Sequence, residues 1–204
     1  MKQLTLKNKL GIDNQIDLAR AEELISKQRA IELWQGDTLK NMTAGTFETL
    51  SAIHKALFGD VYEFAGKLRD VNISKGNFRF ASALYLRDAV LSVEKMSQSN
   101  FDEIVEKYVE MNVAHPFREG NGRSMRLWLD HIFKTELSRV VDWRNVDKNL
   151  YLQAMERSPI NDAEIKKILA VALTDKVDDM EIFMKGLDAS YFYENYFAYR
   201  SEDL

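Results

Sequence analysis

The chain has 204 residues and a net charge of -4, with no cysteine, nine glycines, two prolines and three histidines. The length suits one domain with a substantial core. The small number of glycines and prolines argues against a turn-rich β-sandwich or barrel, and the absence of cysteine excludes disulfide scaffolds and thiolate metal sites. The acidic balance is unlike that of a duplex DNA binder, and no signal peptide or run of ~20 apolar residues is visible, so we expect a cytoplasmic protein that binds neither nucleic acid nor a membrane directly.

Helical periodicity covers most of the chain. Asp13 is a candidate cap for a first helix that reaches Gln35 and ends at Gly36, and Thr46 is a candidate cap for a second. Further helices are expected over residues 82–96, 100–114, 122–137, 147–156, 161–173 and 179–199. The pattern predicts an all-α protein, with residues 1–204 forming a single domain. Two of its helical histidines, His54 and His131, are predicted to be structural.

Residues 68–81 break the helical pattern. Alternating apolar residues flank the dipeptide Gly76-Asn77, which accepts the positive φ angles of a tight hairpin turn. The pattern therefore predicts a short β-hairpin. Because an isolated hairpin is marginal in water, we expect it to be a packed cover or a surface that grips an extended segment.

A rare combination of residues follows the fourth predicted helix. Residues 115–126 read His-Pro-Phe-Arg-Glu-Gly-Asn-Gly-Arg-Ser-Met-Arg. The proline at position 116 stops the preceding helix. The glycine-rich residues 120–122 can turn successive backbone N–H groups to one side, which forms an anion nest that the N-terminus of the next helix reinforces.

Four side chains of this segment suit phosphate chemistry. Arg123 and Arg126 are cations at an already positive helix end, which suggests that an anion normally lies there. Glu119 offers the carboxylate oxygen that Mg²⁺ takes together with phosphate oxygens, and His115 can accept a proton from a hydroxyl. Each feature also has an ordinary reading, as a loop, a helix-end histidine or a solvated pair of arginines. Together they suit phosphoryl or nucleotidyl transfer.

These twelve residues meet every specified position of the signature His-Pro-Phe-x-(Asp/Glu)-Gly-Asn-Gly-Arg-x-x-Arg, so the chain resembles the Fic family. The resemblance implies a Fic-type helical domain with a β-hairpin flap and a core over about residues 40–175. It also implies transfer of AMP from ATP, with Mg²⁺, to a Tyr, Ser or Thr hydroxyl of a target protein. Offshoots of the family that phosphorylate or transfer phosphocholine usually alter this motif, so its intact form favours AMP transfer.

The resemblance further implies roles for single residues. His115 would activate the target hydroxyl, Glu119 would hold Mg²⁺, and Arg126 would bind the γ-phosphate. The expected ATP contacts are Lys75, Asn112, His115, Gly120, Asn121, Gly122, Arg123, Arg126 and Gln153. The flap would dock a target segment by strand-like pairing through Ile73, Ser74, Lys75, Gly76, Asn77 and Phe78.

The C-terminal helix, expected over residues 179–199, resembles an inhibitory element. Its Ser190-x-x-x-Glu194-Asn195 pattern is similar to the motif of the Fic subclass that carries a brake after the core, called class III. Glu194 would pair with Arg126. Because a carboxylate and a phosphate cannot fully share one guanidinium, ATP would bind with its phosphates misplaced. The resemblance therefore implies an autoinhibited enzyme.

Several alternatives stay open at this point. The tail holds six aromatic residues in ten, which is typical of packing or of an oligomer interface, and a homo-oligomer is expected. Tyr191 and Tyr193 are candidates for self-modification if the helix moves away. The enzyme could instead remove AMP or transfer another nucleotide, or the loop could belong to a non-enzymatic nucleotide-binding interaction module. The subclass resemblance suggests a type II topoisomerase subunit as the target.

Overall fold

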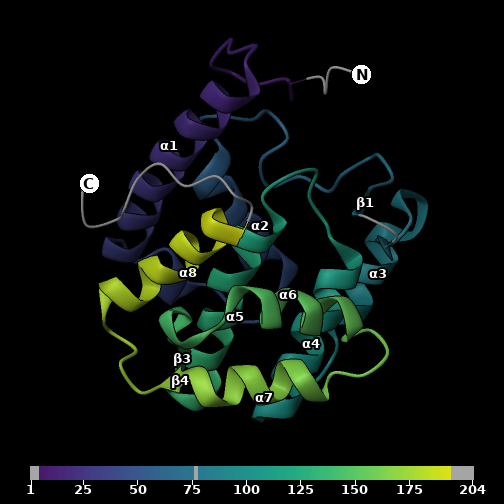
Figure 1. Ribbon diagram of the computed structural model, residues 1–204, viewed down its shortest axis with the longest axis vertical. Coiled ribbons are helices and arrows are strands. Elements are labelled where there is room, and N and C mark those ends of the chain that lie inside the picture. The colour runs from purple at the N-terminus through teal and green to yellow at the C-terminus, as the bar shows by residue number, and fades with distance from the viewer. Residues whose placement is uncertain (1–4, 76–77, 194–204) are drawn as a thin grey trace.

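The computed structural model describes residues 5–75 and 78–191 in full and the backbone of 192–193. Helices make up most of this part of the chain, which confirms the predicted helical class (Figure 1). The helices are α1 (Gln15–Gln35), α2 (Phe47–Phe58), α3 (Leu86–Glu94), α4 (Phe101–Ala114), α5 (Asn121–Leu137), α6 (Lys148–Arg157), α7 (Ala163–Ala172) and α8 (Met180–Tyr193). The short strands are β1 (Ser74–Lys75), β2 (Phe78–Arg79), β3 (Val140–Val141) and β4 (Leu173–Thr174).

The start of α1 differs from the prediction. Asn14, and not Asp13, caps this helix, because the Asn14 side chain accepts the backbone N–H groups of Ile16 and Asp17. The predicted end at Gly36 is confirmed, since the Gly36 N–H closes the last turn on the Glu32 carbonyl. The cap at the start of α2 is also confirmed.

The helix expected over residues 82–96 is shorter in the structure. A 3₁₀ turn over Ala83–Tyr85 precedes α3, which begins at Leu86. Ser82 makes no side-chain cap, and the Asn72 side chain takes the N–H of Ala83 instead at 2.8 Å. A contact from the base of the hairpin therefore sets where this helical segment begins.

The predicted hairpin is present as the antiparallel pair β1–β2. Ser74 lies opposite Arg79 and Lys75 opposite Phe78. The turn residues of the flap prediction, at 76 and 77, lie outside the described part of the chain. A second antiparallel pair, β3–β4, joins the end of α5 to the end of α7 and was not predicted.

The buried helix α5 organises the fold. It packs against α2, α4 and α8, and α1 packs against α2 and α8, so the first and last helices lie side by side (Figure 1). Trp128, Leu129 and Phe133 of α5 are fully buried. No helix in the described part of the chain is both long and apolar enough to cross a membrane. The N-terminal end of α5 is thus held between α1, α2 and α8.

Helix α1 buries charged side chains toward α8. The Lys27 ammonium is fully buried and lies 2.8 Å from Glu23 Oε1 on its own helix and 2.8 Å from Asp188 Oδ1 on α8. A buried ion pair adds little net stability, but breaking it leaves an uncompensated buried charge. The contact between α1 and α8 therefore requires that Lys27 stay opposite Asp188.

Candidate active site

The loop between α4 and α5 closes on itself. His115 ends α4 in the left-handed region, at φ 50 and ψ 65, and Gly120 leads into α5 with φ 78. The Asn121 side chain accepts the Phe117 N–H at 2.8 Å and donates to the Phe117 carbonyl at 2.7 Å. Phe117 is fully buried beneath the loop. The side chain of Asn121 therefore fixes the loop that carries His115.

The predicted anion nest is instead a helix N-terminus. Of residues 120–122, only Gly120 has a positive φ, because Asn121 and Gly122 already belong to the first turn of α5. Gly120 is also required by space, since an added Cβ would lie 2.5 Å from the Phe58 ring. An added Cβ at Gly122 meets no atom within 4 Å. The donors open to an anion are therefore the first-turn amides of α5, with free space beside Gly122.

The His115 ring has a defined tautomer. Its Nδ1 lies 3.3 Å from the Asn112 carbonyl, which can only accept, so Nδ1 carries the hydrogen and Nε2 keeps a lone pair. The ring stacks on Phe80 of the hairpin, with centroids 3.6 Å apart. Burial, helped by the positive charges of Arg69 and Lys75, lowers the pKa of His115 to about 3. His115 is therefore a neutral base at physiological pH.

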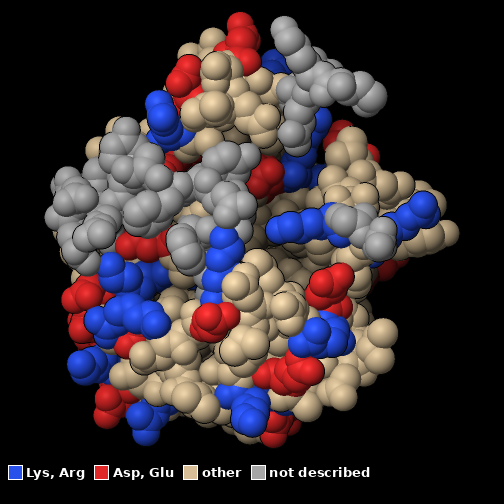
Figure 2. Space-filling view, viewed as in Figure 1, with Lys and Arg blue, Asp and Glu red and all other residues tan. Residues whose placement is uncertain are grey.

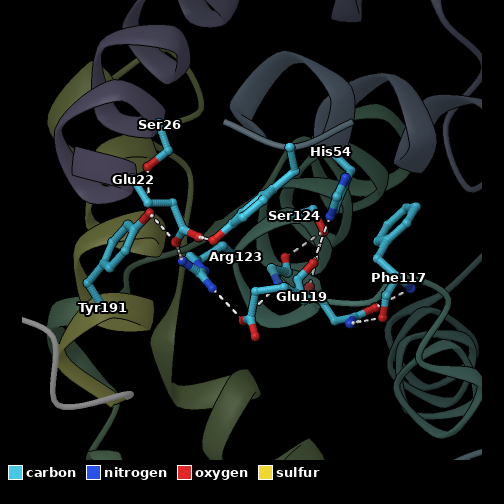
Figure 3. Close-up of polar contacts among 11 residues, drawn as sticks. Glu22, Ser26, His54, Phe117, Glu119, Arg123, Ser124 and Tyr191 are labelled. Carbon is cyan, nitrogen blue, oxygen red and sulfur yellow. Dashed lines mark hydrogen bonds and ion pairs between the residues drawn. The ribbon is translucent and has the colours of Figure 1, made fainter. Parts of the chain in front are cut away.

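Arg123 lies at the centre of a buried polar chain. Its guanidinium pairs with Glu22 of α1 and lies 2.7 Å from Glu119 Oε1, and it packs between the rings of Phe58 and Tyr191. In Figure 3 the contacts run from Glu22 through Arg123 to Glu119. Only 2% of Arg123 is exposed. Arg123 thus connects the first helix to the predicted metal ligand.

Glu119 is braced by His54, which was predicted to be structural only. His54 Nε2 donates to the Glu119 carbonyl at 2.8 Å, and His54 Nδ1 accepts the Gly66 N–H at 2.9 Å. Burial lowers the pKa of His54 to about 4, so the ring is neutral and keeps this tautomer. The brace fixes the backbone of Glu119 while its side chain stays 39% exposed.

The Glu119 carboxylate fits a shared Mg²⁺ site. Its Oε1 accepts from Arg123 and from the Gly120 N–H, and the partly exposed group stands at the N-terminus of α5. Within the described residues there is no group of three or more His, Cys, Asp or Glu side chains that could hold a metal by themselves. One carboxylate completed by phosphate oxygens is an arrangement that Mg²⁺ accepts.

Arg126 contacts the tail helix. Its Nη1 donates to Ser190 Oγ of α8, and Ser190 Oγ donates to the Gly186 carbonyl at 2.9 Å. The guanidinium lies between the rings of Trp143 and Tyr151, 4.8 and 4.9 Å from their centroids. Arg126 is therefore held by α8 on one side and by aromatic rings on others.

The remaining tail residues divide into two sets. Tyr191 is fully buried, with its hydroxyl 2.6 Å from Ser26 Oγ and 3.3 Å from Glu22 Oε1. This hydroxyl becomes accessible only if α8 leaves α1. The side chain of Tyr193, and all of Glu194 and Asn195, lie outside the described part of the chain.

The expected ATP contacts outside the loop lie around it. Lys75 is exposed on β1, Asn112 is half-buried on α4 one turn before His115, and Gln153 is exposed on α6. Figure 2 shows a hollow beside the hairpin with basic side chains at its rim. The structure brings Asn112 and Lys75 to the side of His115 and leaves Gln153 without a described contact to the loop.

Two residues of the site carried no sequence signal. Glu22 lies 101 positions before Arg123, within a stretch of α1 that resembles a solvated face. Arg69 donates to the His115 carbonyl from 46 positions away. Both contacts are long-range, and neither residue stands in a recognisable motif. Only the packing of α1 and the hairpin against the loop reveals them.

Known proteins match this chain over the segment that carries the loop. The Fic/DOC family model matches residues 45–133. The chain is 31% identical over 186 residues to the probable protein adenylyltransferase y4lH of Sinorhizobium fredii, which covers 80% of this chain and 91% of that protein. It is also 31% identical over 175 residues to the protein adenylyltransferase VbhT of Bartonella schoenbuchensis, covering 79% of this chain but only 35% of VbhT.

Solved structures show the same fold. The BepC effector of Bartonella tribocorum, with bound AMPPNP, superposes with a TM-score of 0.73 at 20% identity, over 85% of this chain and 95% of that one. The Fic domain of a putative cell filamentation protein of Bartonella quintana, with bound ADP, gives a TM-score of 0.74 at 20% identity, over 85% and 92% of the two chains. With the family model and a relative matched along nearly its full length, the chain belongs to the Fic/DOC family and is an enzyme of the nucleotidyltransferase class.

Proposed function

We propose that the protein transfers AMP from ATP to a Tyr, Ser or Thr hydroxyl of a target protein, with His115 as the general base. The observation that carries this assignment is the Nε2 lone pair of a neutral His115 in the loop that leads into the N-terminus of α5. The target oxygen would attack the α-phosphorus while its proton passes to Nε2. The bond to the β-phosphate would break, and pyrophosphate would leave.

The other residues of the site bind and orient ATP in this proposal. Asn121 and Gly122 would present first-turn amides of α5 to the phosphates, and Gly120 would let the phosphates approach at the turn before them. Arg123 and Arg126 would supply positive charge. Lys75, Asn112 and Gln153 complete the nucleotide contacts. Glu119 would hold Mg²⁺, which neutralises phosphate charge when bound.

A single substitution tests the base. His115→Ala should lower AMP incorporation from labelled ATP by about 10²–10⁴-fold, because the proton then lacks an acceptor. His131→Ala is the matched control, since His131 lies later on α5 and contacts the Met42 carbonyl. Labelling by His115→Ala at the rate of the parent enzyme would exclude His115 as the base.

We also propose that the tail inhibits the enzyme. The hydrogen bond from Arg126 to Ser190 supports this, because it engages the arginine assigned to the γ-phosphate with a residue of α8. Glu194→Gly should therefore raise AMP transfer, and Ser190→Ala should raise it less. Glu181→Gln, at the start of α8, is the control. If Glu194→Gly gains no activity on any target or on itself, the tail is not a brake.

The identity of the acceptor can be read from the same preparation. The hairpin, over Ile73–Phe78, is proposed to dock the target segment, since β1 is exposed on the face beside His115. Labelled ATP in cell lysate would reveal the target band, with a type II topoisomerase subunit as one candidate.

Mass spectrometry would show AMP on Tyr191 or Tyr193 if the tail modifies itself. Size-exclusion chromatography would show whether the enzyme is a homo-oligomer.

Removal of AMP and transfer of other nucleotides are the rival activities. Each nucleoside triphosphate offered to Glu194→Gly would identify the donor, and a premodified target would test removal. A non-enzymatic nucleotide-binding module would bind ATP with Mg²⁺ and label nothing. The neutral His115 argues against such a module, because binding alone needs no base.

A further inference from the structure

Arg69 is a buried arginine that binds backbone carbonyls. It is 5% exposed, and in the described part of the chain no carboxylate lies within ion-pair distance of it. Its Nε donates to the His115 carbonyl at 2.8 Å and its Nη1 to the Val71 carbonyl at 2.7 Å. Its Nη2 donates to the carbonyls of Ala81 at 2.5 Å and Ala114 at 3.1 Å. The Arg69 guanidinium thus donates hydrogen bonds to four backbone carbonyl groups.

These carbonyls come from two different segments. Val71 and Ala81 stand on the two sides of the hairpin at its base, whereas Ala114 and His115 end α4. Two backbone bonds run between the same segments. The Arg69 N–H donates to the Pro116 carbonyl at 2.9 Å, and the Ala81 N–H donates to the Val113 carbonyl at 3.0 Å. The base of the flap and the backbone of His115 are therefore tied together.

The position of the charge has a physical reason. The last carbonyls of α4 lack helical partners and carry the negative end of the helix dipole, so a cation with several donors is favourable there. His115 also has a left-handed backbone, which is costly for a residue with a side chain. The bond from Arg69 Nε to the His115 carbonyl holds that conformation.

We propose that Arg69 is a positioning residue that sets the flap and His115 in one fixed relation. A target segment on the flap would then present its hydroxyl to Nε2 of His115. This role rests on the proposed AMP transfer, but it concerns the acceptor side of the reaction. None of these Arg69 bonds reaches residues 119–126, so we expect the phosphate contacts of the nucleotide to remain without it.

The test separates catalysis from nucleotide binding. In the Glu194→Gly background, Arg69→Gln should lower the rate of AMP incorporation at saturating ATP by about 10²-fold, because a small displacement of base and acceptor has that cost. The dissociation constant of AMPPNP should stay within about twofold. Arg69→Lys keeps the charge but not the fork, and should recover part of the rate. Arg29→Gln, at an exposed ion pair, is the control.

A second measurement does not depend on activity. Hydrogen exchange at the Ala81 amide, which donates to Val113, should become faster in Arg69→Gln and in Arg69→Lys than in the parent. The positioning role would be overturned if Arg69→Gln lost AMPPNP affinity and AMP incorporation to the same extent. It would also be overturned if exchange at Ala81 stayed as slow as in the parent and the rate of AMP incorporation did not change. If Glu194→Gly itself transfers no AMP, the proposed function fails, and unchanged exchange at Ala81 would still refute the tie between flap and loop.

Discussion

The two histidines at the site hold their protons on opposite nitrogens. His115 donates from Nδ1 to a carbonyl and leaves Nε2 bare, whereas His54 accepts at Nδ1 and donates from Nε2 to Glu119. The difference follows from the partner of each Nδ1, which is the Asn112 carbonyl in one case and the Gly66 N–H in the other. One ring is thereby prepared to take a proton, and the other to brace a backbone.

The pH dependence of catalysis follows from the lowered pKa of His115. Because this pKa is about 3 in the free protein, the base stays deprotonated from pH 5 to 8. The kcat/KM of Glu194→Gly should therefore show no acidic limb from His115 in that range. A pH–rate profile with ATP held constant measures this. A limb with a midpoint near the ordinary imidazole value of about 6.5 would contradict it.

His54 should make stability depend on pH. Its pKa is about 4 when folded and about 6.5 when unfolded, so between these values the unfolded chain binds more protons. Above pH 6.5 the ring is neutral in both states, and His54 does not change the free energy of unfolding with pH. As the pH falls from 6.5 to 4, the free energy of unfolding drops by roughly 3 kcal/mol. His54→Gln lacks this titration, and its urea midpoint should fall less between pH 7 and 4.5. Equal falls in both proteins would refute the buried neutral ring.

At the scale of elements, the contact between α1 and α8 is the one that a single substitution should weaken most. Lys27→Met removes the buried cation between Glu23 and Asp188 and should destabilise the protein by roughly 3–5 kcal/mol. Loosening of α8 should also raise AMP transfer, although Lys27 is not assigned to ATP. Thermal unfolding and labelling measure the two effects. Lys40→Met, at an exposed pair with Asp37, should change neither.

Local signals predicted the elements whose ends are set locally. The caps at Thr46, Asn100 and Asp147 lie within the segments that they start, and the flap was visible from its turn dipeptide. The β3–β4 pair was not predicted, because Val141 and Leu173 pair across two intervening helices of the chain. The burial of charge on α1 escaped for the same reason.

The site was predictable where the signature is contiguous. The positions of His115 and Glu119 follow from the loop itself. The partners that orient them, Glu22, His54 and Arg69, come from other helices and from the hairpin, and periodicity does not encode such contacts. Of residues 120–122, only Gly120 takes the expected positive φ, because α5 begins one residue earlier than its glycines suggested.

At the scale of the whole molecule, the proposed function makes the tail and the nucleotide competitors for one end of α5. ATP with Mg²⁺ should therefore raise the melting temperature of Glu194→Gly more than that of the parent. A ligand at one hundred times its dissociation constant stabilises by about 2.7 kcal/mol. Differential scanning fluorimetry measures this, with EDTA added as the control that removes the metal. Equal shifts in both proteins would show that the tail does not restrict ATP.

The three tryptophans of the chain give this competition an optical readout. The Trp143 ring lies 4.8 Å from the Arg126 guanidinium, and the Trp34 ring lies 4.9 Å from Phe183 of α8. Trp128 is buried on α5, where its Nε1 donates to the Thr46 carbonyl. In a version that keeps only Trp143, emission should change when the contacts of Arg126 change, and in a version that keeps only Trp34 it should change when α8 leaves α1. A version that keeps only Trp128 serves as the reference. Each single-tryptophan version of the protein thus reports one of these events without an added label.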